Sequence, residues 1–96
     1  MSQQQQIGSH KTSIFTDEGF TNVIYHNTAV VRFNKDKIIL NSGGWLTNTT
    51  KTRMNQASNQ FNLGFSVFQK NYDWFVTNEN NEILPFSDGM ILTNLN

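Results

Sequence analysis

The sequence predicts a small α+β domain in which one helix packs on one face of a small antiparallel sheet. Two pairs of β-rich runs, each pair joined by a short polar connection, predict two hairpins. A segment with helical spacing lies between the two pairs, which gives the order β-β-α-β-β. A small open barrel with a helical lid is the alternative that this pattern also allows.

Ninety-six residues form one domain. Residues 1–12 are rich in glutamine and lack apolar periodicity, so they bury too little apolar surface to offset the entropy of ordering. We therefore expect a flexible N-terminal tail over residues 1–12 and a single α+β domain over residues 13–96. Eight Phe, two Trp and two Tyr supply most of the large side chains for its core.

The strands before the helix are predicted from runs of β-branched and aromatic residues bounded by turn signals. These runs are residues 14–15, 22–26, 29–33 and 37–41. The last two form the first hairpin, because a polar connection separates them. Alternation along residues 29–33 places Val31 and Phe33 on one face of the sheet, and Val30 and Arg32 on the other.

The helix is predicted from about residue 50 to residue 61, because apolar residues recur there at helical spacing. Its apolar stripe consists of Met54, Ala57 and Phe61. Thr49 or Thr50 can cap its start by accepting a hydrogen bond from a free N–H group of the first turn. Gly64 is the residue expected to end it. The opposite face is polar, so packing on the sheet must stabilise this helix.

The second hairpin is predicted over residues 65–70 and 73–77, which alternate at period two around Asn71 and Tyr72. Residues 83–86 can add a strand at the edge of the sheet only, since Pro85 has no N–H to donate. Residues 90–92 form a last short strand or a packed tail.

The candidate functional site is the segment that leads from a strand through Gly43 and Gly44 into the helix. A helix start offers free N–H groups and positive electrostatic potential, which hydroxyl and basic side chains reinforce for binding phosphate. The residues of this candidate anion site are Thr49, Thr50, Lys51, Arg53, Trp45 and His26. The segment is not a P-loop, because the second glycine of that motif is missing. In the other interpretation, the glycines form a turn and the threonines cap the helix.

The net charge is zero, but the charge is unevenly distributed. Residues 19–72 carry six basic side chains and one acid, whereas residues 73–96 carry four acids and no base. Such asymmetry indicates a surface for an anion or a nucleic acid, or else surface charges that the fold mixes. Trp45 and Tyr72, each beside turn residues, are the candidates for exposed base stacking.

Several function classes lack support in the sequence. No nucleophile elbow or catalytic triad pattern is present, so we expect a protein that is not an enzyme. Without Cys, and with two separated His, we expect no metal and no cofactor. No run approaches the ~18 apolar residues of a membrane span, and the N-terminus lacks the features of a secretory signal. We therefore expect a cytoplasmic protein that does not bind membranes.

Five motifs carry a resemblance to known sequences. They are YHxTxVV at 25–31, LNSGGW at 40–45, TTKxRMNQ at 49–56, LGFxVFQK at 63–70 and WFV at 74–76. Through them the chain resembles a group of small uncharacterised proteins of tailed bacteriophages. The resemblance implies a phage accessory protein made in the host cytoplasm, and it implies no particular activity.

Two functional hypotheses follow. In the first, the protein is a binding module that holds a phosphate of a nucleic acid or nucleotide at the helix start. In the second, it is an interaction module that engages a host or phage protein through a sheet edge or its polar helix face, without a small-molecule ligand. The salt dependence of binding distinguishes the two hypotheses. The affinity for a phosphate falls steeply as the salt concentration rises, whereas the affinity of a mainly apolar protein interface does not. The sequence leaves the oligomeric state open.

Overall fold

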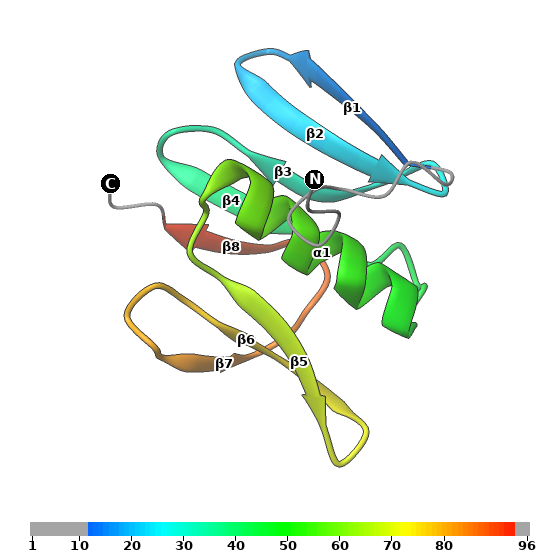
Figure 1. Ribbon diagram of the computed structural model, residues 1–96, viewed down its shortest axis with the longest axis vertical. Coiled ribbons are helices and arrows are strands. Elements are labelled where there is room, and N and C mark those ends of the chain that lie inside the picture. The colour runs from blue at the N-terminus through cyan, green and yellow to red at the C-terminus, as the bar shows by residue number, and fades with distance from the viewer. Residues whose placement is uncertain (1–11, 94–96) are drawn as a thin grey trace, which may run out of the picture.

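The computed structural model describes residues 12–93, which contain eight strands and one helix (Figure 1). The elements are β1 (Thr12–Asp17), β2 (Phe20–Tyr25), β3 (Thr28–Phe33), β4 (Lys37–Leu40), α1 (Asn48–Phe61), β5 (Ser66–Lys70), β6 (Asp73–Thr77), β7 (Ile83–Pro85) and β8 (Met90–Thr93). The predicted α+β class is confirmed. Of the predicted tail, residues 1–11 lie outside the described residues, and Thr12 is the first residue of β1.

The strands form two antiparallel sheets and not one. Sheet A has the order β1-β2-β3-β4-β8, and sheet B has the order β5-β6-β7. The helix α1 contacts β2 and β3 of sheet A and β5 of sheet B, so it joins the two sheets (Figure 1). The prediction of two hairpins around a helix matches this arrangement only roughly. Each predicted hairpin belongs to a different sheet, and further strands extend both of them.

Three of the hairpin connections are two-residue turns in which both residues have positive φ. They are Glu18-Gly19 between β1 and β2, His26-Asn27 between β2 and β3, and Asn71-Tyr72 between β5 and β6. Such turns match the natural right-handed twist of the flanking strands. The predicted turn at Asn71-Tyr72 is therefore present. His26, expected as the last residue of a strand, instead lies in a turn.

A β-bulge in β3 changes which of its side chains are buried. Val23 pairs with Val31, whereas the next residue of β2, Ile24, pairs with Ala29, so Val30 has no partner in β2. An extra residue of this kind interrupts strict alternation. As a result, Val30 and Val31 are both fully buried in the core, although alternation placed them on opposite faces.

The helix begins earlier than predicted. Thr47, in an extended conformation (φ −118°, ψ 164°), is the N-cap, and its hydroxyl accepts a hydrogen bond from the Thr50 N–H. The sequence prediction of Thr49 or Thr50 as the cap is therefore wrong, because the first turn already contains both residues. At the other end, Asn62 adopts the left-handed conformation (φ 56°) two residues before Gly64, the residue expected to end the helix.

The polar face of α1 is partly bound to the edge of sheet B. The Asn55 side chain donates to the Val67 carbonyl (3.0 Å) and accepts from the Val67 N–H (2.7 Å). One turn later, the Ser58 hydroxyl donates to the Phe65 carbonyl (2.6 Å) and accepts from its N–H (3.1 Å). Two side chains of the helix thus satisfy backbone groups of Val67 in β5 and of Phe65 just before it.

The core lies between sheet A, sheet B and α1. Its buried apolar side chains are Val23, Tyr25, Val30, Val31, Ile38, Leu40, Met54, Ala57, Leu63, Phe65, Val67, Trp74, Val76 and Leu92. Met54 and Ala57 of the predicted stripe are fully buried. Phe61 lies at the margin of the core, where its ring packs 4.9 Å from that of Phe33. Hydrogen bonds, as well as apolar contacts, fix the helix, so a narrow apolar stripe is sufficient.

Candidate binding surfaces

The backbone N–H groups of Ser42, Gly43 and Gly44, in the loop between β4 and α1, have hydrogen-bond partners within the protein. The Asp88 carboxylate accepts from the backbone N–H of Ser42 (2.7 Å) and from its hydroxyl (2.8 Å). The N–H of Gly43 donates to the Asn41 side chain (2.8 Å), and that of Gly44 to the Ser42 hydroxyl (3.1 Å). The N–H groups of the glycine pair are therefore occupied within the protein.

Gly43 is required by a close approach of two chain segments. A Cβ atom at this position would lie 2.3 Å from the Thr28 hydroxyl oxygen, and the φ angle of Gly43 is +63°. Both features exclude larger residues. A Cβ atom on Gly44 would meet nothing within 4 Å, so Gly44 serves the turn alone. The glycine pair is thus explained by packing and backbone geometry.

The two threonines of the candidate anion site have different environments. Thr50 is fully buried, and its hydroxyl lies 3.2 Å from the Thr47 hydroxyl, with which it shares a hydrogen bond. Thr49 is exposed in the first turn. Of the two hydroxyl groups, only that of Thr49 is accessible to a ligand.

Lys51 and Arg53 point to opposite flanks of the helix. The Lys51 ammonium donates to the Gln69 side chain (3.0 Å) and lies 5.5 Å from the centre of the Trp74 ring, on the side of sheet B. The Arg53 guanidinium donates to the Thr12 hydroxyl (3.1 Å), on the side of β1. Two residues along a helix correspond to a rotation of roughly 200°. The two cations therefore do not converge on one phosphate.

Neither cation of the helix is neutralised within residues 12–93. The ion pair found there joins Arg32 to Asp17, at 3.7 Å, and no carboxylate lies within 4 Å of Lys51 or Arg53. The helix itself contains no acidic residue. Its first half is consequently electropositive, through two side-chain charges and the helix dipole.

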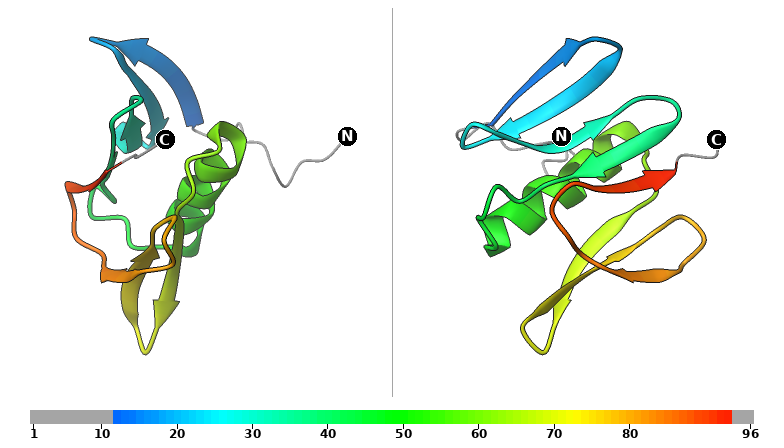
Figure 2. Two further views of the ribbon diagram at one scale, coloured as in Figure 1. Left: turned by 90° about the vertical axis from the view of Figure 1, so that its left-hand side faces the viewer. Right: turned by 180° about the vertical axis from the view of Figure 1, so that it is seen from behind.

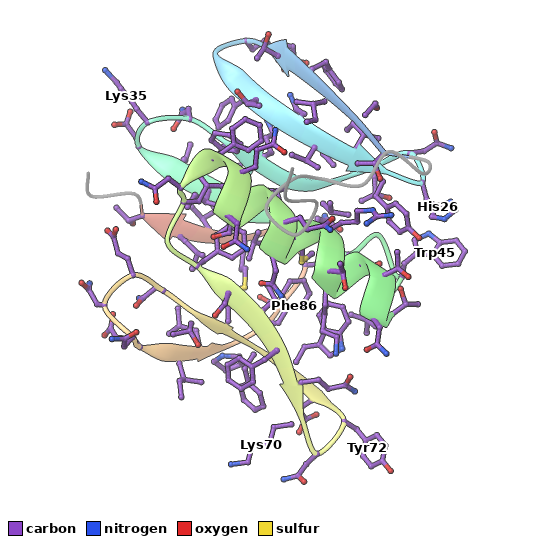
Figure 3. The ribbon with its side chains drawn as sticks, in the orientation of Figure 1. His26, Lys35, Trp45, Lys70, Tyr72 and Phe86 are labelled. Atoms are coloured by element: carbon purple, nitrogen blue, oxygen red, sulfur yellow. The ribbon has the colours of Figure 1, made fainter. Side chains whose placement is uncertain are left out.

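His26 and Trp45 lie together beside the start of the helix, as Figure 3 shows. Their rings stack at 5.4 Å with an interplanar angle of 24°, and Trp45 is 51% exposed. The Tyr25 ring meets His26 edge-on at 4.3 Å and lies 5.7 Å from the Arg53 guanidinium. The fold thus brings His26, Trp45 and Arg53 together around Tyr25, while Lys51 lies on the other flank. Sequence reasoning missed Tyr25 as the residue that connects them.

A second surface is the face of sheet A that points away from α1, which we call the bare face. No described segment covers it (Figure 2, left). The strand register assigns to this face the apolar residues Phe15, Phe20, Ile24, Ile39 and Ile91. Phe15 is 47% exposed and Ile91 is 59% exposed. The bare face therefore presents apolar side chains in β1, β2, β4 and β8, whereas β3 contributes Arg32.

The bare face also carries two cations. The Arg32 guanidinium lies 4.4 Å from the centre of the Phe20 ring, and the Lys37 ammonium lies 5.7 Å from it. Asp17 partly neutralises Arg32 at 3.7 Å. The Nε of Arg32 is buried and has no hydrogen-bond partner among residues 12–93. Apolar and basic groups are thus mixed on this face.

A depression of about 640 Å³ lies at the far end of the helix from the candidate anion site. Its lining includes the aromatic residues Phe33 and Phe61 and the polar residues Lys35 and Asn62. None of the candidate site residues lines it. The depression and the helix start are therefore separate features.

No group of three or more His, Cys, Asp or Glu side chains within residues 12–93 is placed to hold a metal ion. The one helix in that range is not long and apolar enough to cross a membrane.

A family model described as Kyanoviridae Gp96 protein matches residues 1–93, which is nearly the whole chain. No curated protein matches the sequence, and no solved structure matches the fold.

Proposed function

The chain belongs to the Kyanoviridae Gp96 protein family, so it is a phage protein. We propose that it is an accessory protein that binds a host or phage protein through the bare face of sheet A. It works in the host cytoplasm, by binding and not by catalysis, and it uses no metal or cofactor. The apolar composition of the bare face is the observation that carries this proposal.

An antiparallel sheet with one solvated face ordinarily alternates apolar residues inward with polar residues outward. Sheet A departs from that pattern, because aromatic and aliphatic side chains occur on its outward face in β1, β2, β4 and β8. Exposed and half-buried apolar side chains on one face of a sheet are typical of protein interfaces. The basic side chains of Arg32 and Lys37 add specificity for a partner that carries carboxylates, since opposite charges steer and orient association.

The bare face is tested by capturing partners from phage-infected cells on the immobilised protein. We compare the parent with Ile91→Asp, which places a charge on the bare face, and with Ile83→Asp, a matched control on sheet B. Both isoleucines are well exposed (59% and 63%), so neither substitution disturbs the core. A partner that the parent and the Ile83 variant retain at high salt, and that the Ile91 variant loses, is the expected result. Equal retention by all three proteins contradicts the proposal.

A phosphate-bearing ligand at the helix start, either a nucleic acid or a nucleotide, is the second candidate function. It is favoured by the two cations without carboxylate partners and by the exposed Trp45 stacked on His26. Because Lys51 and Arg53 lie on opposite flanks, a single-stranded nucleic acid that passes across the helix start suits them better than one bound phosphate.

Trp fluorescence tests this candidate directly, since Trp45 stacks on His26 and Trp74 lies beside Lys51. Single-stranded and duplex oligonucleotides and common nucleotides are titrated at low salt. The candidate predicts a response that weakens steeply with salt. The Lys51→Ala and Arg53→Ala variants should each bind more weakly, and Lys70→Ala, at the far end of β5, should bind like the parent. Full affinity in both helix variants excludes the helix start as the site.

A further inference from the structure

Sheets A and B together have four edge strands, and three of them are protected against further strand pairing. The edge of β5 is covered by α1, whose Asn55 side chain occupies both backbone groups of Val67. The strand β7 has three residues and ends at Pro85, and β8 has four residues. Coverage, proline and short length are the usual devices that keep a sheet edge from pairing with another chain.

Within residues 12–93, the fourth edge, β1, has none of these devices along residues 13–17. It has six residues, without proline, lysine or arginine, and it pairs with β2 in a continuous register without a bulge. Five of its six residues are exposed. Ile14 (43% exposed) and Phe15 (47% exposed) place apolar side chains on both faces of the strand. A long, apolar edge without protection is a template for another strand.

We propose that this edge binds a second copy of the chain, so that the two β1 strands pair antiparallel across a two-fold axis at Phe15. In this register Phe15 lies opposite Phe15 of the other copy, and aromatic cross-strand pairs are among the stabilising ones. Ile14 lies opposite Thr16, and Ser13 lies opposite Asp17. No two like charges face each other, and the hydroxyl of Ser13 can donate to the carboxylate of Asp17.

The charges of the chain favour a second copy as the occupant of this edge. The strand carries one charged residue, Asp17, whose carboxylate already lies 3.7 Å from Arg32 of its own chain. The net charge of the chain is zero, so two copies approach each other without long-range repulsion. A closed two-fold dimer also pairs residues 13–17 of both β1 strands with each other, so this edge is no longer available for filament growth.

The dimer goes beyond the proposed function and does not depend on it. Because opposite residues of an antiparallel pair lie on the same face, the axis at residue 15 is perpendicular to the sheet. The bare faces of both copies then lie on the same side of a continuous ten-stranded sheet. Their central part remains open to the partner proposed above.

The test measures the mass of the purified full chain by sedimentation over a range of concentrations. The parent is expected to have twice its chain mass of 11.0 kDa. Phe15→Lys and Phe15→Glu should each be monomeric, because they place like charges opposite each other, and an equimolar mixture of the two should restore the dimer. Ile91→Lys, at a somewhat more exposed position (59% against 47%) on the opposite edge strand of sheet A, should remain dimeric.

A second pair of variants changes the charge without removing the aromatic ring. Ser13→Asp faces Asp17 of the other copy and should raise the dissociation constant of the dimer, whereas Ser13→Lys should lower it. Each effect should be roughly 2- to 30-fold, since the pair occurs twice in the dimer. Far-ultraviolet circular dichroism establishes that each variant is folded.

Several outcomes overturn the dimer. A parent that is monomeric at every concentration does so, as does a Phe15→Lys variant that keeps the parent mass or an Ile91→Lys variant that dissociates. A mixture of the lysine and glutamate variants that stays monomeric, or Ser13 variants that shift affinity in the same direction, overturns the register at Phe15. If Ile91→Asp loses the captured partner and remains dimeric, the result supports the bare face as the partner's binding site and does not contradict the dimer.

Discussion

The Asn55 side chain shows how one polar residue can hold a helix against a sheet. An asparagine offers a carbonyl oxygen and an amide group, which together match the N–H and the carbonyl of one strand residue. On α1 these groups bind both backbone groups of Val67. A backbone group that is left unpaired in a partly buried setting costs more than the hydrogen bond contributes net. Asn55 therefore has a structural role that a helical wheel does not reveal.

Replacing Asn55 by alanine should lower the free energy of unfolding by about 1–3 kcal/mol, because the N–H and the carbonyl of Val67 lose their partner. Asn59→Ala is the matched control on the same helix. Asn59 is exposed, so its replacement should change stability by less than about 0.5 kcal/mol. Urea denaturation measures both variants. Equal destabilisation by the two substitutions would show that the contact with Val67 contributes nothing.

Single residues also explain why part of the candidate site was predictable. The exposed Trp45 was expected, and the structure exposes it. The divergence of Lys51 and Arg53 follows from 100° of rotation per helical residue, so it was available once the helix was placed. The role of Asp88 could not be predicted, because Asp88 lies 46 residues from Ser42 in the sequence and no local pattern connects the two residues.

At the scale of elements, the sequence predicts what local chemistry determines. The turn at Asn71-Tyr72 and the helical stripe of Met54 and Ala57 depend on neighbours in the chain, and both are present. The division into two sheets depends on where α1 docks, which distant contacts decide. The bulge at Val30 likewise arises from the pairing of β2 with β3 and has no signature in one strand alone.

The N-cap of α1 is Thr47, whose hydroxyl contributes to the stability of the helix. Thr47→Ala should lower the free energy of unfolding by about 1 kcal/mol, because the Thr50 N–H loses its acceptor. Thr49→Ala, two residues later and exposed, is the control and should have an effect below about 0.5 kcal/mol. Chemical denaturation of both variants compares them. A larger decrease in the free energy of unfolding for Thr49→Ala than for Thr47→Ala would show that Thr49, and not Thr47, caps the helix.

At the scale of the whole molecule, sheet A is completed by β8, the last strand within residues 12–93. The strand β8 pairs with β4, so Lys37 lies opposite Thr93. Three contacts fix the segment before β8, namely the two hydrogen bonds from Ser42 to Asp88 and one from the Gly89 N–H to the Leu40 carbonyl (2.7 Å). The loop after β4 and the loop before β8 are thereby joined.

Asp88→Ala should lower the free energy of unfolding by about 2–3 kcal/mol, because Ser42 is buried and its N–H loses a charged acceptor. Asp36→Ala, in the exposed turn between β3 and β4, provides the control for loss of one carboxylate. Its effect should stay within about 0.5 kcal/mol. Thermal and urea unfolding give the two values. Similar stability of the two variants would mean that the Asp88 contacts do not hold the loops together.

The pairing of β4 with β8 also bears on how fast the chain folds. Every other strand pair joins neighbours in the sequence, and such pairs close small loops at little entropic cost. The β4–β8 pair instead closes a long loop, because the helix and all three strands of sheet B lie between β4 and β8 in the sequence. Folding rates fall as contacts become less local. We therefore expect the pairing of β4 with β8 to be the slow step of folding, and the hairpins of both sheets to form before it.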